Sequence, residues 1–152
     1  MVTAPVLYFA ADHAGVALKD ALRTVFEKRF ADVRAVDLGT QGLESVHYPD
    51  FAFLAADKVA KSGGLAVLVC GSGIGMAIAA NKVSGIRAAV VWDATSGRLC
   101  KEHNDANVLC LGARLVGPAA AEDALFAWWT AAFAEGRHRE RLERIRARES
   151  QR

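Results

Sequence analysis

The sequence has little of what marks a membrane, secreted or metal-binding protein. No apolar run approaches the ~20 residues of a membrane-spanning helix, and no basic segment precedes an apolar one near Met1, so we expect no secretory signal. The three cysteines, Cys70, Cys100 and Cys110, are odd in number and widely spaced, which fits neither a disulfide framework nor a zinc site. We therefore expect a reduced cytoplasmic protein, without a metal site and without membrane contact.

Neither sign of charge is in large excess, because the net charge is only +2. Its distribution is uneven. Seven arginines and four acids lie between Glu135 and Arg152 (net +3), and twelve basic and thirteen acidic residues lie in the rest (net −1). The basic tail interleaves acids and has no aromatic side chain on which a base could stack. Nucleic-acid binding is therefore not expected.

Short apolar runs alternate with amphipathic segments along the chain. The predicted strands are 6–11, 33–38, 65–70, 86–92 and 106–111. A predicted helix follows the first strand, with Leu18, Leu22, Val25 and Phe26 at helical spacing. The others run from Pro49 to Lys61, over 76–82, to about Glu102, from Pro118 to Ala134 and, as a charged helix, from about Arg137 to the end of the sequence. Such alternation is typical of a parallel sheet covered on both faces, and 152 residues suffice for one domain, 1–152.

The third apolar run ends in Cys70, and Gly71, Gly73 and Gly75 follow at once. Backbone N–H groups of a glycine turn at a helix N-terminus attract a phosphate, a thiolate or an oxyanion, so Cys70 is a candidate base or nucleophile. Cysteine also fills cores and glycine also serves tight turns, so both interpretations stay open at this point. The G-x-G-x-G spacing, with no acidic residue about 20 positions later, does not fit dinucleotide binding.

Further polar residues follow the predicted strands or end the helices after them. They are Asp12, His13, Ser72, His103, Asn104 and Arg114. Because ligands of parallel sheets bind at the carboxyl ends of the strands, we expect these residues to converge on that edge. Each has an ordinary alternative, since Asp12 could cap a helix, His13 could be a solvated loop residue, and His103 with Asn104 could end a helix.

In the basic tail, Arg137 and Arg141 stand four residues apart on one face of the predicted helix. Paired guanidinium groups suit a phosphate, although a solvated basic helix is the alternative. Only Leu142 and Ile145 could anchor this helix, and that stripe is too narrow to hold it alone. We expect the helix to dock on a second copy of the chain.

Six short blocks, in this order, resemble ribose-5-phosphate isomerase B, of the family shared with galactose-6-phosphate and allose-6-phosphate isomerases. They are residues 11–15 (ADHAG), 48–50 (YPD), 70–75 (CGSGIG), 79–82 (AANK), 103–109 (HNDANVL) and 136–138 (GRH). The resemblance extends from Val6 to about Ile145. It implies a Rossmann-like three-layer α/β/α sandwich that forms a homodimer, or a dimer of dimers, with active sites shared between subunits. It also implies interconversion of ribose 5-phosphate and ribulose 5-phosphate without a metal or organic cofactor.

The resemblance further implies a role for each site residue. Cys70 would be the base that moves a proton between C2 and C1, because members that lack this cysteine carry a glutamate at the position of Gly75. Ser72 would assist the transfer. The backbone amides of the loop from Gly71 to Gly75, among them that of Gly73, would hold the enediolate. Asp12 and His103 would open the furanose ring. The phosphate-site positions are His13, Arg137, His138 and Arg141, and Asn104 and Arg114 are further substrate contacts.

At one position the sequence departs from the family pattern, and this leaves the identity of the sugar substrate open. Many members have an aspartate before the Tyr48–Pro49 pair, where this chain has His47. An isomerase of a six-carbon sugar phosphate, allose or galactose 6-phosphate, is the alternative within enzymes. A sugar-phosphate sensor on the same fold is the alternative outside them, since fold alone does not fix function. A sensor would need the arginines but not Cys70.

Overall fold

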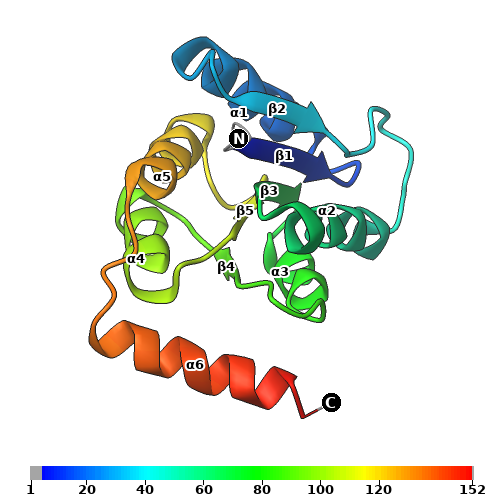
Figure 1. Ribbon diagram of the computed structural model, residues 1–152. Coiled ribbons are helices and arrows are strands. Elements are labelled where there is room, and N and C mark those ends of the chain that lie inside the picture. The colour runs from blue at the N-terminus through cyan, green and yellow to red at the C-terminus, as the bar shows by residue number, and fades with distance from the viewer. Residues whose placement is uncertain (1–4, 152) are drawn as a thin grey trace.

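One parallel sheet forms the centre of the molecule (Figure 1). The computed structural model describes residues 5–151, so the expectation about a signal sequence at residues 1–4 lies outside them. The strands run in the order β2-β1-β3-β5-β4. They are β1 (Val6–Ala11), β2 (Arg34–Asp37), β3 (Leu65–Cys70), β4 (Ala88–Val90) and β5 (Val108–Gly112). All four neighbouring pairs are parallel, as the apolar runs predicted.

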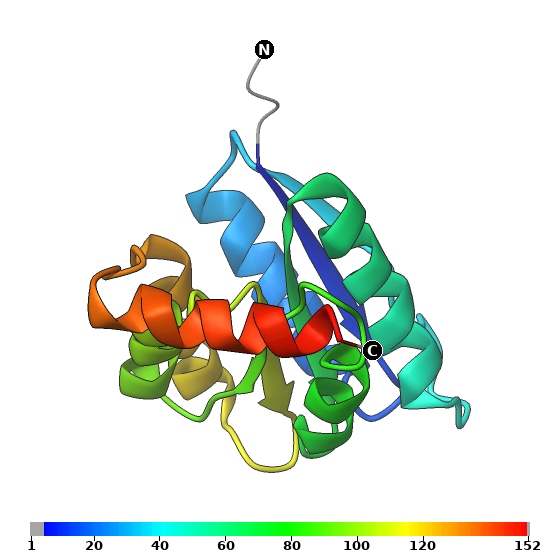
Figure 2. The same cartoon turned by 60° about the horizontal axis from the view of Figure 1, so that its bottom comes forward.

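Helices cover both faces of the sheet. In chain order they are α1 (Val16–Arg29), α2 (Tyr48–Ser62), α3 (Ile74–Ala80), α4 (Ala94–Asn104), α5 (Pro118–Thr130) and α6 (Arg137–Glu149). Helices α1, α4 and α5 lie on one face and α2 and α3 on the other, whereas α6 lies outside both layers and crosses one side of the molecule (Figure 2). The predicted three-layer α/β/α fold is confirmed. Within residues 5–151, no helix is long and apolar enough to cross a membrane.

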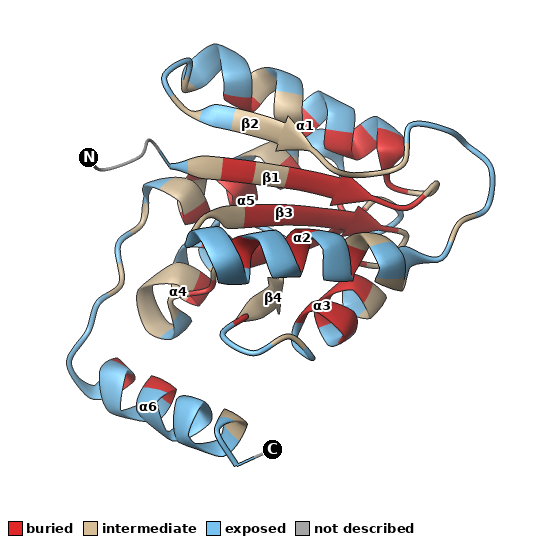
Figure 3. Cartoon of the chain, turned by 45° about the vertical axis from the view of Figure 1, so that its right-hand side comes forward, coloured by how far each residue is buried: buried red, intermediate tan, exposed pale blue. Residues whose placement is uncertain are grey.

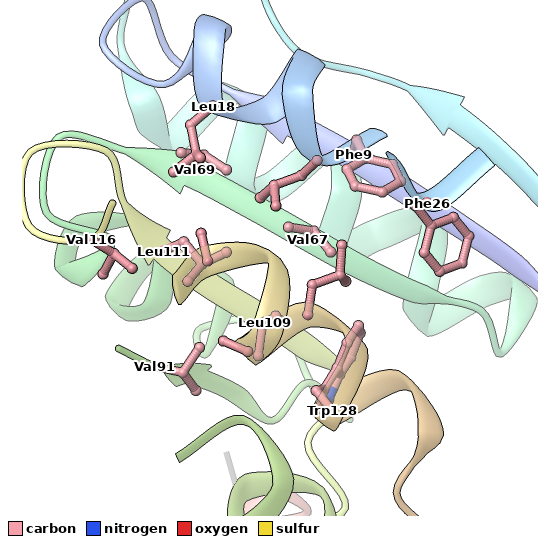
Figure 4. Packing of buried hydrophobic residues seen from close by; sticks show 14 of the residues in the cluster. Phe9, Leu18, Phe26, Val67, Val69, Val91, Leu109, Leu111, Val116 and Trp128 are labelled. Carbon is pink, nitrogen blue, oxygen red and sulfur yellow. The ribbon is translucent and has the colours of Figure 1, made fainter. Parts of the chain in front are cut away.

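Two apolar cores, one on each side of the sheet, hold the layers together. Alternate strand residues such as Phe9, Val67 and Leu109 pack against α1, α4 and α5, where Trp128 is fully buried (Figure 4). Their neighbours along the strands pack against α2 and α3, with Cys70 among them. The sheet is therefore buried on both faces, and α6 is mostly exposed (Figure 3). Site residues on this framework sit at the sheet edges, in loops and at helix ends.

Two predicted boundaries are wrong by several residues. Strand 86–92 shrinks to β4, because the N–H groups of Arg87 and Trp92 bind the side chains of Asn107 and Ser96 instead of a neighbouring strand. The helix expected to reach Ala134 ends at Thr130, after which the backbone is extended and the Ala134 N–H donates to Glu102 O (2.8 Å). The short connection from α5 to α6 is thus fastened to the last turn of α4.

A buried ion pair fastens α1 to the end of β2. The Lys19 side chain is fully buried, and its Nζ donates to both carboxylate oxygens of Asp37 (2.9 and 2.7 Å) and to Thr40 O (3.3 Å). Burial alone would raise the pKa of Asp37. Hydrogen bonds from Lys19, Gln41 and the Gly39 N–H, together with the lysine charge, outweigh it and hold that pKa below its usual value.

Asp37→Asn is expected to lower the free energy of unfolding by about 3 kcal/mol at pH 7, because a buried ammonium loses its counter-charge. The folded-state pKa of Asp37 is depressed, so its contribution is present above the unfolded carboxyl's pKa and is lost as pH falls through the folded value. Urea unfolding at pH 7 and pH 3 should therefore show a smaller difference at pH 3. Asp20→Asn, which removes the half-exposed second partner of Lys19, is the control and should cost under about 1 kcal/mol. Equal losses for the two variants would contradict the argument.

Candidate active site

Cys70 ends β3 at the carboxyl edge of the sheet. Its side chain is 4% exposed, and the Gly73 N–H donates to Sγ (3.1 Å). Gly73 has φ +76°, a conformation that favours glycine, and this turn is what aims its N–H back at the sulfur. Ser72 lies in the same turn and accepts the Ile74 N–H at Oγ (3.2 Å). The loop therefore offers backbone donors to negative charge beside a thiol.

The three cysteines differ in their surroundings. Burial raises the pKa of Cys100 to about 11, and that thiol donates to Gly97 O (3.1 Å), a contact that uses its proton. Burial also raises the pKa of Cys110, which is fully enclosed in the core. Cys70 instead accepts a hydrogen bond at its sulfur. Of the three sulfurs, that of Cys70 is the one that receives a backbone N–H at the carboxyl edge of the sheet.

Asp12 and His13 follow β1 at the same edge. Asp12 is buried, and its Oδ1 accepts the N–H groups of Ala14 (3.0 Å) and Gly15 (3.2 Å), so it organises the turn before α1. It is not the cap of that helix, because the N-cap residue is Gly15 and the helix has no side-chain cap hydrogen bond. The Val46 N–H donates to His13 Nδ1 (3.2 Å). The neutral ring therefore carries its proton on Nε2, which is left to meet a ligand.

Close backbone packing gathers these residues around Cys70. A Cβ added at Gly15 would lie 2.4 Å from Val69 O, so only glycine lets the β1–α1 turn rest directly on the end of β3. Arg114, after β5, places its guanidinium over Gly71, because a Cβ there would come within 3.1 Å of Nη1. The carboxyl edge thus unites Asp12, His13, Cys70, Ser72 and Arg114, as predicted.

Two further residues were missed by sequence reasoning. The Tyr48 ring lies against Gly75, and a Cβ added there would fall 2.6 Å from a ring carbon, so this site has no room for a side chain at position 75. Tyr48 belongs to YPD, one of the six blocks that resemble the isomerase family, and that resemblance was the one indication of a role for it. Val46 acts through its backbone N–H, which no side-chain pattern reports.

His103 and Asn104 lie at the opposite edge, and the expectation that they join Cys70 within one chain is wrong. They end α4, whose last carbonyl groups are bound by Arg87 just before β4 (Nε to Asn104 O, 3.0 Å). A helix after a parallel strand runs back, so its end returns to the amino edge of the sheet. The six residues of β3 alone span roughly 16 Å between the two edges.

The basic helix α6 lies beside His103. The His138 ring is 8% exposed and stacks on the His103 ring, with centroids 4.3 Å apart and planes 10° from parallel. Burial, then the charges of His103, Arg137 and Arg141, lower the pKa of His138. Arg137 and Arg141 are exposed and form no ion pair within the described residues.

Helix α6 has one apolar anchor on its own chain, and its docking on a second copy stays a prediction. Leu142 is buried, whereas Ile145 is 49% exposed. Between the outer part of α6 and the segment 81–89 lies a cavity of about 910 Å³, lined by apolar Ile86 and Ala88 as well as Leu142 and Ile145. The large cavity is therefore remote from Cys70. Nowhere in residues 5–151 do three His, Cys, Asp or Glu side chains gather as metal ligands would.

Known proteins match the chain over nearly its whole length. Residues 7–145 match the family described as Ribose/Galactose Isomerase. The chain is similar to ribose-5-phosphate isomerase B of Escherichia coli, with 41% identity over 147 residues that cover 95% of this chain and 96% of the relative.

Solved structures agree in fold. Ribose-5-phosphate isomerase B of Clostridium thermocellum gives a TM-score of 0.92 with 41% identity, covering 96% of this chain and 98% of that one. The enzyme from Mycoplasma genitalium with bound ribulose-5-phosphate gives 0.93 with 37% identity, covering 97% of each. Since sequence and fold agree over almost the full length, the chain belongs to the Ribose/Galactose Isomerase family and is a sugar-phosphate isomerase.

Proposed function

We propose that this protein interconverts ribose 5-phosphate and ribulose 5-phosphate through an enediolate, with Cys70 as the base. The observation that carries the proposal is the Cys70 sulfur at the end of a buried strand, accepting the Gly73 N–H at 3.1 Å. Two relatives support the sugar: the E. coli protein named ribose-5-phosphate isomerase B, and the M. genitalium structure with bound ribulose-5-phosphate.

The proton would move at the glycine loop. The Cys70 thiolate takes the proton from C2 of the open-chain aldose, and the electron pair moves onto O1 as the enediolate forms. Returning the proton to C1 gives the ketose, while the Ser72 hydroxyl helps shift a proton between O1 and O2. Loop amides from Gly71 to Gly75 stabilise the developing negative charge because they are fixed before the reaction begins.

The groups that lie at the opposite edge of the sheet would come from a second copy. Ring opening needs an acid and a base at the furanose oxygen and the anomeric hydroxyl, roles we assign to His103 and Asp12. Arg137 and Arg141 would clamp the phosphate with His13, while His138, Asn104 and Arg114 complete the substrate surroundings. In one chain His103 and the arginines lie far from Cys70, so an isologous dimer is the arrangement that unites them.

Exposed apolar side chains near the carboxyl edge support a covered interface there. Ile74 and Ile78 on α3, Trp92 after β4 and Leu115 after β5 are each more than half exposed. Apolar side chains gathered beside a polar site favour burial against another surface. A second copy that covered them would enclose Cys70 and exclude bulk water from the enediolate.

His103→Gln is expected to slow turnover of cyclic ribose 5-phosphate by about 100-fold. Exchange of the C2 proton in 4-deoxyribose 5-phosphate, which lacks the hydroxyl that closes the furanose, should change much less. The comparison pairs steady-state isomerisation with deuterium exchange followed by NMR. Equal losses on both substrates would mean that His103 has no special part in ring opening.

Purified protein assayed with ribose 5-phosphate, allose 6-phosphate and galactose 6-phosphate tests the choice of sugar. The family description includes galactose, and His47 stands beside Tyr48 at the glycine loop, so a six-carbon substrate is the alternative. The proposal requires the highest kcat/KM with ribose 5-phosphate. Phosphate-dependent binding of all three sugars without turnover would instead support a sensor.

A further inference from the structure

His138 is packed in a way that does not suit a phosphate ligand. Its ring lies flat on the His103 ring and is 8% exposed, whereas Arg137 and Arg141 on either side of it are exposed. A phosphate needs donors that reach outward from the surface, and the two guanidinium groups supply them. His138 instead presents its face to another imidazole.

Three interactions hold the backbone on either side of the stacked His103 and His138 rings. The Ala134 N–H donates to Glu102 O (2.8 Å), which fastens the segment before α6 to the last turn of α4. Leu142, one turn beyond His138, is buried as well. On the other side, Arg87 holds the end of α4 through Asn104 O and Asp105 O (both 3.0 Å from Nε). The His103 backbone is therefore fixed, and stacking on His138 restrains its ring.

We propose that His138 is a positioning residue that holds the plane of the His103 imidazole, and that it is not a phosphate ligand. The inference rests on the role proposed above for His103 in ring opening. Stacking uses the faces of both rings and leaves the nitrogen-bearing edge of His103 free to meet the sugar. Proton transfer to a ring oxygen requires that edge to be aligned, because small displacements of a reacting group cost large factors in rate.

The charges around the stack favour a neutral His138. The groups that act on it are His103 from α4 and Arg137 and Arg141 from its own helix, and all of them oppose a further positive charge. Two protonated rings 4.3 Å apart would repel each other. A neutral His138 can thus stack on His103 at neutral pH.

Three variants test the proposal by kinetics: His138→Ala, His138→Phe and, as the phosphate-clamp control, Arg137→Ala. For His138→Ala we expect kcat with cyclic ribose 5-phosphate to fall about tenfold. KM should stay within about twofold and exchange with 4-deoxyribose 5-phosphate should change little. His138→Phe should recover most of the loss, because a flat ring is restored. Arg137→Ala should instead raise KM.

A second measurement needs no turnover. The chain has only four histidines, so single-histidine variants assign each imidazole signal by NMR. In His138→Ala the His103 ring signals should move, because the shielding by the stacked ring is lost. In His138→Phe the ring signals should again show the shielding of a stacked ring. Unchanged His103 signals in His138→Ala would overturn the proposal.

The kinetic outcomes separate this proposal from the function on which it rests. A steep rise of KM in His138→Ala that phenylalanine does not repair would make His138 a phosphate ligand and overturn the inference. Normal turnover in His103→Gln would instead remove the proposed role of His103, while the NMR shifts would still establish the stack.

Discussion

Cys70→Ala is expected to lower kcat for isomerisation by about 10³-fold or more, because it removes the group proposed to take the C2 proton. The fold should survive. The sulfur lies at the very end of β3 and accepts one backbone hydrogen bond, from Gly73, so its removal should cost only about 1 kcal/mol. Binding of inorganic phosphate should be unchanged, since the arginine clamp does not include Cys70.

The other two cysteines are matched controls for this experiment. Cys100→Ala and Cys110→Ala should retain turnover, because both thiols pack in the core and burial raises the pKa of each. Cys110→Ala should lower stability by about 1 kcal/mol through the small cavity that it leaves. The measurements are steady-state kinetics, urea unfolding and phosphate binding by calorimetry. Near-normal turnover in Cys70→Ala would exclude the thiol as the base.

The sheet was predictable because its signal is local. Each strand is a short apolar run between helices. A strand that is buried on both faces is apolar at nearly every position, so the run itself identifies it. The edge strand β4 was overestimated because residues 86–92 are mostly apolar, whereas the N–H groups of Arg87 and Trp92 donate to side chains and not to a strand. A pattern of residue types does not record which acceptor a backbone group finds.

The site was predictable only where its residues follow strands directly. Cys70, Asp12, His13 and Arg114 come after strand ends, so the topology alone brings them to one edge. His103 lies at the end of a helix, and a helix returns the chain to the other edge of the sheet, which separates His103 from Cys70. The stack of His138 on His103 depends on how α6 folds back, and no spacing in the sequence specifies that path.

This separation of Cys70 from His103 leads to the second large effect. If each site takes Cys70 from one subunit and His103 from the other, a mixed dimer of Cys70→Ala and His103→Gln chains contains one intact site and one doubly altered site. Each variant alone should be nearly inactive. Random mixing makes about half of the dimers mixed, so activity should return to about one quarter of the wild-type value per chain. Subunits are exchanged by unfolding the two variants together in urea and refolding them.

A matched pair of variants from one edge makes the result specific. Cys70→Ala mixed with Ser72→Ala should recover nothing, because both residues lie in one loop and every site in a mixed dimer then lacks one of them. His103→Gln mixed with Arg137→Ala should fail likewise, since both lie beside the start of α6. Recovery by the Cys70 and His103 pair alone therefore requires a site built across two chains. A monomer that sediments as one chain and is fully active would contradict the shared site, because His103 and Cys70 of one chain would then suffice. Recovery by all three mixtures would contradict it too, because the two same-edge mixtures cannot form an intact site in a shared arrangement.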